Sequence, residues 1–203
     1  MTEHRTGPAR SPYHQRLPYG ERLSAAPLTG SPFFGFEGDT ITMRPLEPML
    51  VPEEPRSGEL DPAECFHCRP DPEHLIWRDA RWHVDAASVT GLPFIAGLAP
   101  NAHVRLDQMD AALLATFGDL VQRLAGAIQS LDGVARTHFS RWGDGSAHFH
   151  LHFMARPLGM MQGRGPMLAF WDDVLPPTDP ALLAAHGRQV AEALAAQGGE
   201  ALV

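Results

Sequence analysis

The sequence is poor in three kinds of residue, and each scarcity excludes a class of protein. Only two of its 203 residues are cysteines, which excludes a disulfide-stapled secreted scaffold and makes a reducing cytoplasm the expected location. Lysine and arginine number 16 against 24 acidic residues, and a net charge of -8 is the opposite of what a general nucleic-acid or anionic-membrane binder shows. No apolar run approaches the roughly 20 residues that span a bilayer, and the polar residues 1–20 do not read as a secretory signal. We therefore expect neither nucleic acid nor membrane as a partner.

The chain is long enough for one domain with a proper core and short for two. Residues 1–60 contain nine of the nineteen prolines and show no helical periodicity. This composition predicts an N-terminal extension that is partly disordered or draped on the core. Residues 61–203 are predicted to form the folded domain.

Alternating and periodic hydrophobic patterns predict the elements of that domain. A stripe of period 3.6 predicts a long helix with Asp107 as its N-cap and Gly133 at its end, and Asp179-Pro180 opens a C-terminal helix. Strands are predicted over 75–78, 82–84, 93–98, 134–141 and 148–156, the first two as a hairpin. Together these elements predict an α+β fold, with an antiparallel sheet meander, one long helix and a C-terminal helix.

The segment His148-Phe149-His150-Leu151-His152 is the richest in chemistry. In a strand, alternate side chains share a face, so the three imidazoles are predicted to lie together while Phe149 and Leu151 pack on the core. A core has little use for three imidazoles, because each needs hydrogen-bond partners. A solvent-facing polar edge is the simplest non-functional interpretation. Two chemistries use such a row: nucleophilic attack on phosphorus by a neutral imidazole, or ligation of a catalytic metal.

This segment resembles the motif of the histidine-triad superfamily, in which hydrophobic residues separate three histidines. The resemblance covers about residues 63–157 and includes a CxxC and the sequence Pro100-Asn101-Ala102-His103 before a long helix. It implies that His150 attacks the α-phosphate of a nucleotide and forms a covalent nucleotidyl-histidine. It further implies that His152 binds a phosphate oxygen and that His148 orients the nucleophile or ligates zinc. The implied activity is hydrolysis or transfer on a phosphoanhydride or phosphoramidate, by a homodimer and without a catalytic metal.

The pair Cys65 and Cys68 has the spacing of half a zinc site. The resemblance to zinc-bearing members, including the galactose-1-phosphate uridylyltransferase branch, supplies His103 and His148 as the other two ligands of a structural zinc. His67, between the cysteines, is a competing ligand. A pair of inert thiols is the alternative interpretation.

The loop before the histidines departs from the superfamily pattern, because Arg141-Trp142-Gly143-Asp144-Gly145-Ser146 lacks the usual amide side chain. The backbone of Gly145, the hydroxyl of Ser146 and the guanidinium of Arg156 are candidate phosphate-binding groups. Asp85 lies near the position of an acid that holds ribose hydroxyls, but off register. Two further interpretations stay open: a metal-dependent enzyme with the three histidines as ligands, and a non-catalytic nucleotide-binding protein on the same fold.

Overall fold

The computed structural model describes Pro45 and residues 48–203. The chain contains two compact units, and the second, Pro55–Val203, holds every element described below. Most of the predicted N-terminal extension therefore lies outside the described residues. Its last residues belong to the second unit, because Ser57 forms an isolated bridge with Ser146 in the loop before the histidines.

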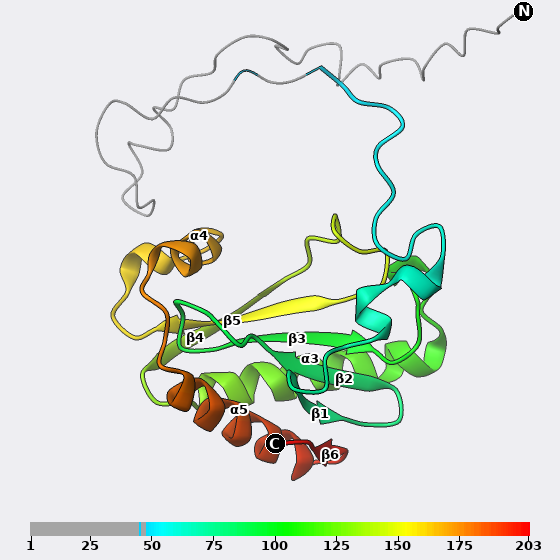
Figure 1. The fold of residues 1–203 in the computed structure, drawn as a ribbon. Helices are drawn as coiled ribbons and strands as arrows, with labels where there is room; N and C mark the ends of the chain where they lie inside the picture. The colour runs from blue at the N-terminus through cyan, green and yellow to red at the C-terminus, as the bar shows by residue number, and fades with distance from the viewer. Residues whose placement is uncertain (1–44, 46–47) are drawn as a thin grey trace, which may run out of the picture. The chain divides into compact units, whose positions relative to one another are not determined.

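Six strands form one antiparallel sheet (Figure 1): β1 Leu75–Arg78, β2 Trp82–Ala86, β3 Ile95–Pro100, β4 Val134–Ser140, β5 Leu151–Pro157 and β6 Glu200–Ala201. Their order is β4-β5-β3-β2-β1-β6. The first three strands run as a meander, and the predicted hairpin is confirmed as β1-β2. The chain then crosses through a long helix, and β5 inserts between β3 and β4. The predicted α+β class with an antiparallel sheet is confirmed.

The long helix, α3 (Ala111–Gln129), begins and ends at other residues than predicted. Asp110 is its N-cap rather than Asp107, because the Asp110 carboxylate accepts a hydrogen bond from the N–H of Leu113 at 2.8 Å. The helix ends at the Ser130 cap, and Gly133 lies in a later turn with a φ of 71°. A turn with positive φ favours glycine. Gly133 therefore marks a turn, as glycine often does, but not the end of the helix.

Two shorter helices follow β5. Helix α5 (Pro180–Ala195) is confirmed with Asp179 as its N-cap and proline at its start. Helix α4 (Met167–Val174) was not predicted, because eight residues supply too few periods of a helical pattern to stand out.

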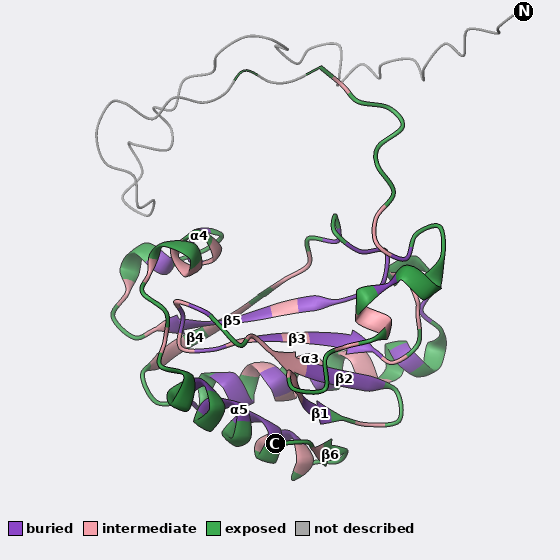
Figure 2. Cartoon of the chain, in the orientation of Figure 1, coloured by how far each residue is buried: buried purple, intermediate pink, exposed green. Residues whose placement is uncertain are grey.

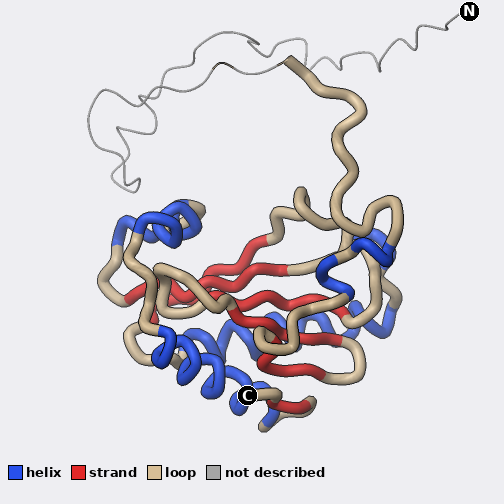
Figure 3. The backbone as a smooth tube through the Cα atoms, in the orientation of Figure 1, coloured by secondary structure: helices blue, strands red, loops and turns tan. Residues whose placement is uncertain are grey.

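The two faces of the sheet have different coverings. Helices α3 and α5 lie on one side and α4 lies on the other (Figures 1 and 3). The side covered by α3 and α5 forms the main core, whose fully buried members include Trp77, Trp82, Leu98, Phe149 and Phe153 (Figure 2). Burial of each large apolar side chain stabilises the fold by about 1.5–3 kcal/mol. The opposite face is only partly covered, and the candidate site is located there.

Candidate active site and metal cluster

The three alternating histidines divide between two neighbouring sites. Strand β5 begins at Leu151, not at His148 as predicted, and residues 148–150 lead into it without regular secondary structure. The ring of His148 is fully buried against two cysteines, while His150 and His152 line a cavity. The predicted strand start at His148 is therefore corrected to Leu151. The ring of His67 lies near the rings of both His148 and His150, with centroids 5.7 and 4.4 Å apart, so these rings remain close together.

The cluster around His148 consists of the four residues predicted as metal ligands. One ligand atom from each lies within 4.8 Å of all the others, and the four residues are Cys65, Cys68, His103 and His148. The cysteines come from the 3-10 turns before β1, His103 follows β3, and His148 precedes β5. Within residues 45 and 48–203 this is the one such convergence of three or more His, Cys, Asp or Glu side chains.

Distances within the cluster fit a tetrahedral zinc ion. The Nδ1 atom of His148 lies 3.5 Å from the sulfur of Cys65 and 3.5 Å from that of Cys68, and the Nδ1 atom of His103 lies 3.3 Å from the Cys68 sulfur. With Zn–S near 2.3 Å and Zn–N near 2.0 Å, a tetrahedron has S···N edges of about 3.5 Å. Gly58 closes over the cluster with a φ of 73°, and a Cβ there would meet the Cys65 Cβ at 2.6 Å.

Protonation in the cluster also fits a divalent cation. The Nε2 atom of His148 lies 2.9 Å from the backbone carbonyl of Pro100, which can only accept, so Nε2 carries the proton and Nδ1 offers its lone pair to the cysteines. Burial lowers the pKa of His148 to about 4, so the ring is neutral at pH 7. Burial and the neighbouring Cys65 raise the pKa of the Cys68 thiol to about 11, so a cation is needed to hold the Cys68 sulfur as a thiolate.

His150 has one ring nitrogen engaged and the other unengaged among the described contacts. Its Nδ1 lies 2.9 Å from the backbone carbonyl of His148. Because a carbonyl only accepts, Nδ1 is the protonated nitrogen, and the neutral ring keeps a lone pair on Nε2. The ring of His152 stands at its edge, with centroids 5.0 Å apart and an interplanar angle of 86°. The tautomer of His150 with its proton on Nδ1 leaves the Nε2 lone pair available for nucleophilic attack.

His67 belongs to the His150 site rather than to the metal cluster. Its ring stacks on that of His150 with centroids 4.4 Å apart and an interplanar angle of 28°. Burial, and then the neighbouring imidazoles, lower the pKa of His67 to about 3, so this ring is also neutral at pH 7. The structure thus separates His67 from the four ligand residues. Stacking covers one face of the His150 ring, which is 6% exposed and lines a cavity.

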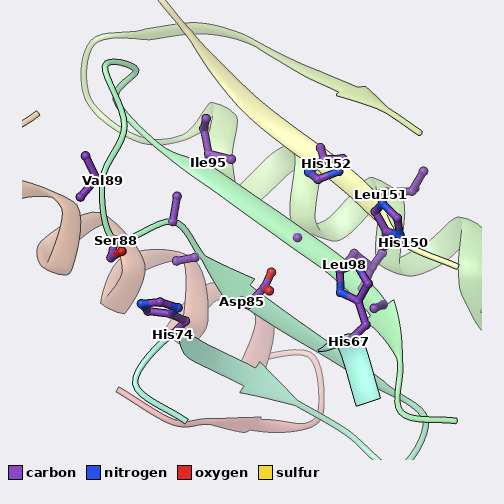
Figure 4. A pocket seen from close by; sticks show the side chains of 14 residues that line it. His67, His74, Asp85, Ser88, Val89, Ile95, Leu98, His150, Leu151 and His152 are labelled. Carbon is purple, nitrogen blue, oxygen red and sulfur yellow. The ribbon is translucent and has the colours of Figure 1, made fainter. Parts of the chain in front are cut away.

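A cavity of about 330 Å³ extends from these rings across the sheet (Figure 4). Asp85 on β2, Gly97 on β3 and His152 on β5 stand in register, so all three face the same side. The absent side chain of Gly97 makes room, because a Cβ there would collide with the carboxylate of Asp85. Figure 4 shows Asp85 between His150 and His67 on one side and His74 and Val89 on the other.

Sequence reasoning placed Asp85 off register and gave His67 only a role as a competing ligand. The register of β2 against β3 brings Asp85 into the cavity, and a two-residue alternation from His83 to Asp85 could have suggested it. No comparable signal exists for His67, because the direction of a side chain in a short 3-10 turn does not follow a sequence period.

The three candidate phosphate-binding residues lie outside this cavity's lining. Ser146 is fully buried, and its hydroxyl accepts from the His148 N–H at 3.2 Å beside the Cys65 sulfur. The Gly145 carbonyl accepts from the Ser57 N–H at 3.1 Å. Arg156 is buried, and its guanidinium donates to the Met160 carbonyl at 3.0 Å. Their described contacts stabilise the loops on either side of the site, and a phosphate-binding role for them stays a prediction.

No model of a known protein family matches the sequence, and no curated protein matches it significantly. Among solved structures, similar chains include histidine-triad proteins, the superfamily that the motif indicates. A zinc-bound histidine triad family protein from Mycobacterium smegmatis is 18% identical with a TM-score of 0.47, covering 66% of this chain and 96% of that one. A Hit-like protein involved in cell-cycle regulation from Bartonella henselae is 18% identical with a TM-score of 0.41, covering 59% and 85%.

A uridylyltransferase structure is also similar, at 16% identity and a TM-score of 0.43. That similarity covers 63% of this chain and 45% of the uridylyltransferase chain, so the present chain spans less than half of its length. At these sequence identities and TM-scores, similarity does not establish that the chain has the activity of any of these proteins. The functional assignment depends on the geometry of the site.

Proposed function

We propose that the protein cleaves or transfers a nucleoside monophosphate from a phosphoanhydride or phosphoramidate, with His150 as the nucleophile. The observation that supports this most directly is the hydrogen bond from His150 Nδ1 to the His148 carbonyl at 2.9 Å, which presents the Nε2 lone pair beside a cavity. A neutral imidazole with this tautomer attacks phosphorus without prior loss of a proton.

In the first step, Nε2 of His150 forms a bond to phosphorus while the bond from phosphorus to the leaving oxygen or nitrogen breaks in line. The leaving group keeps the bonding electron pair and takes a proton from solvent or a neighbouring donor. Burial lowers the pKa of His152, so this ring is neutral at pH 7 and donates one N–H to a phosphate oxygen. Water or another acceptor then attacks phosphorus and releases His150. Asp85 is positioned to accept hydrogen bonds from sugar hydroxyls in the cavity.

We assign a structural zinc to the four-residue cluster. Cys65, Cys68, His103 and His148 would supply the four ligands of a tetrahedral zinc site, which would leave no coordination position for water. When bound, zinc would tie the N-terminal turns, the end of β3 and the approach to β5 together. A reducing compartment such as the cytoplasm would keep both thiols available. The metal-dependent alternative is less well supported, because the cluster includes neither His150 nor His152.

The proposed function is tested by trapping the covalent intermediate. The protein is incubated with adenosine 5′-phosphoramidate, quenched after a few turnovers, digested and mapped by mass spectrometry. We expect an adenylyl adduct on His150. Turnover with an adduct on another residue would contradict the assigned nucleophile, and binding without turnover or adduct would favour the non-catalytic alternative.

We further propose that two copies associate through α3 and the edge strand β4. The most apolar 18-residue stretch of α3 has a mean hydropathy of 1.3, but only 22% of it is buried. Leu114, for example, is 54% exposed. β4 is an edge strand with Phe139 exposed at 53%, and the unpaired backbone groups of an edge strand are a template for pairing with a second chain.

Replacing Phe139 with aspartate is expected to convert a dimer into a monomer of 22.2 kDa, because the charge would lie in an apolar contact. Light scattering coupled to size exclusion measures the mass. Leu182→Asp, at a residue 47% exposed on α5, is the matched control and should stay dimeric. A wild-type protein that is monomeric at tens of micromolar would overturn the proposal.

A further inference from the structure

A second cavity lies on the same face of the sheet as the first. Its volume is about 360 Å³, which is within the range of sites for small organic groups. Strand β4, the loop after it, β5 and α4 contribute its walls, chiefly through His138, Ser140, Trp142, Met154, Leu168 and Ala169. None of these residues was assigned a substrate role from the sequence.

The ring of His152 stands between the two cavities. Ser140 is the register partner of His152, so the Ser140 side chain lies next to it on the same face. The indole of Trp142 approaches the His152 ring from this side, with centroids 5.1 Å apart and an interplanar angle of 36°. A phosphorus atom held by His152 would therefore have one cavity on each side.

The two cavities differ in charge. The first contains the carboxylate of Asp85, whereas the residues that line the second include no Asp, Glu, Lys or Arg. Burial lowers the pKa of His138, so its imidazole is uncharged at neutral pH. The polar groups offered are therefore the Ser140 hydroxyl and this imidazole, beside the indole, the Met154 thioether and aliphatic side chains. Such a surface favours an uncharged flat group over a phosphate.

The α4 wall of the second cavity is anchored to the sheet. The carboxylate of Asp172 accepts hydrogen bonds from the Thr90 hydroxyl and from the Gly91 N–H, the latter at 2.8 Å. Leu168 packs with Leu92 and Met154 in a separate apolar cluster. Helix α4 lies beyond residues 63–157, the stretch whose sequence resembles the histidine-triad superfamily.

We propose that the second cavity binds the leaving group of the reaction, and that this group is uncharged and aromatic. The inference rests on the proposed function, since it needs a phosphorus atom attacked by His150 between the two cavities. The preferred substrate is then a nucleoside monophosphate joined through a P–N or P–O bond to an aryl group.

For an anilidate, His150 Nε2 bonds to phosphorus and the P–N bond breaks. The nitrogen keeps the electron pair, takes one proton and departs as neutral aniline. Water then replaces His150 on phosphorus and yields the nucleoside monophosphate. No oxidant or reductant is needed. A nucleoside diphosphate would instead expel a phosphate anion into an uncharged cavity.

The test compares kcat/KM for adenosine 5′-phosphoroanilidate, adenosine 5′-phosphoramidate and ADP. We expect the anilidate to be favoured over ADP, and its advantage over the phosphoramidate to fall about tenfold in Trp142→Ala and in Ala169→Leu. The readout is kcat/KM for the anilidate divided by kcat/KM for the phosphoramidate, because a general loss of activity lowers both values and leaves their ratio unchanged. Phe170→Ala, at an aromatic side chain on α4 that is 61% exposed, is the matched control and should keep the wild-type ratio.

An unchanged ratio in both cavity variants, or a preference for ADP, would overturn the proposal. If no substrate is cleaved and no adduct forms, the proposed function fails instead, and the cavity is then tested by binding alone. Acetanilide should shift the Trp142 indole N–H resonance saturably in the wild type and not in Ala169→Leu. No saturable shift in the wild type would also overturn the proposal.

Discussion

Replacing His150 with alanine is expected to reduce turnover of adenosine 5′-phosphoramidate by about a thousandfold or more and to abolish the adenylyl adduct. The side chain supplies the proposed nucleophile, because it lines the first cavity and its Nε2 lies opposite the Nδ1–carbonyl hydrogen bond. Loss of this group removes the two-step route, and direct attack by water lacks an equivalent activated atom. Steady-state rates and quenched mass spectrometry measure both effects.

The fold should survive this substitution, because His150 is not one of the four residues of the metal cluster. Thermal unfolding and metal content of His150→Ala are therefore expected to stay near those of the wild type. His186→Asn is a matched control remote from the site, since an asparagine amide can still donate to the Pro93 carbonyl that His186 Nδ1 contacts at 2.9 Å. Retained turnover in His150→Ala would refute the mechanism.

Replacing Cys65 with serine is expected to remove the zinc ion and to lower the free energy of unfolding by several kcal/mol. Cys65 is 1% exposed and is packed under Gly58, so a serine there offers a weaker ligand without room to rearrange. Metal analysis of the purified protein and chemical denaturation measure the two effects. The wild type should contain one zinc per chain.

Three variants, compared by metal analysis, distinguish the structural zinc site from the alternative metal sites. His67→Phe should keep one zinc per chain, because the His67 ring stacks on His150 instead of joining the cluster. Metal that disappears with His67→Phe would show that this residue is a ligand. Metal that is retained in Cys65→Ser and lost in His150→Ala would favour an enzyme in which the histidine row holds the ion.

The sequence predicted which residues form the site better than it predicted how they are arranged. The spacing of Cys65 and Cys68, with the resemblance, named the same four ligand residues that converge in the structure. The predicted strand start at His148 was wrong, because pairing begins at Leu151. His148 instead contacts Cys65 and Cys68, which are far from it in the chain, and no local pattern announces such a contact.

The elements with strong local signals were predicted, and those that depend on tertiary packing were not. Asp179 and Pro180 mark the start of α5 by local hydrogen bonding and a fixed φ, so the prediction is confirmed. Helix α4 is held by Asp172 against the turn at Thr90, a contact between residues far apart in the chain. The same limit applies to Asp85, whose place in the cavity follows from strand register rather than from its neighbours.

The group that fixes the proton on His150 is a main-chain oxygen and not a side-chain carboxylate. Every amino acid at position 148 would carry that oxygen, so no point mutation can delete it, and protonation in acid cannot neutralise it as it would an aspartate. The proton position on His150 is then disturbed by moving the peptide itself. Selection for a reactive imidazole would accordingly act on the contacts that hold this peptide in place. The side chain of the same residue, His148, makes one of these contacts.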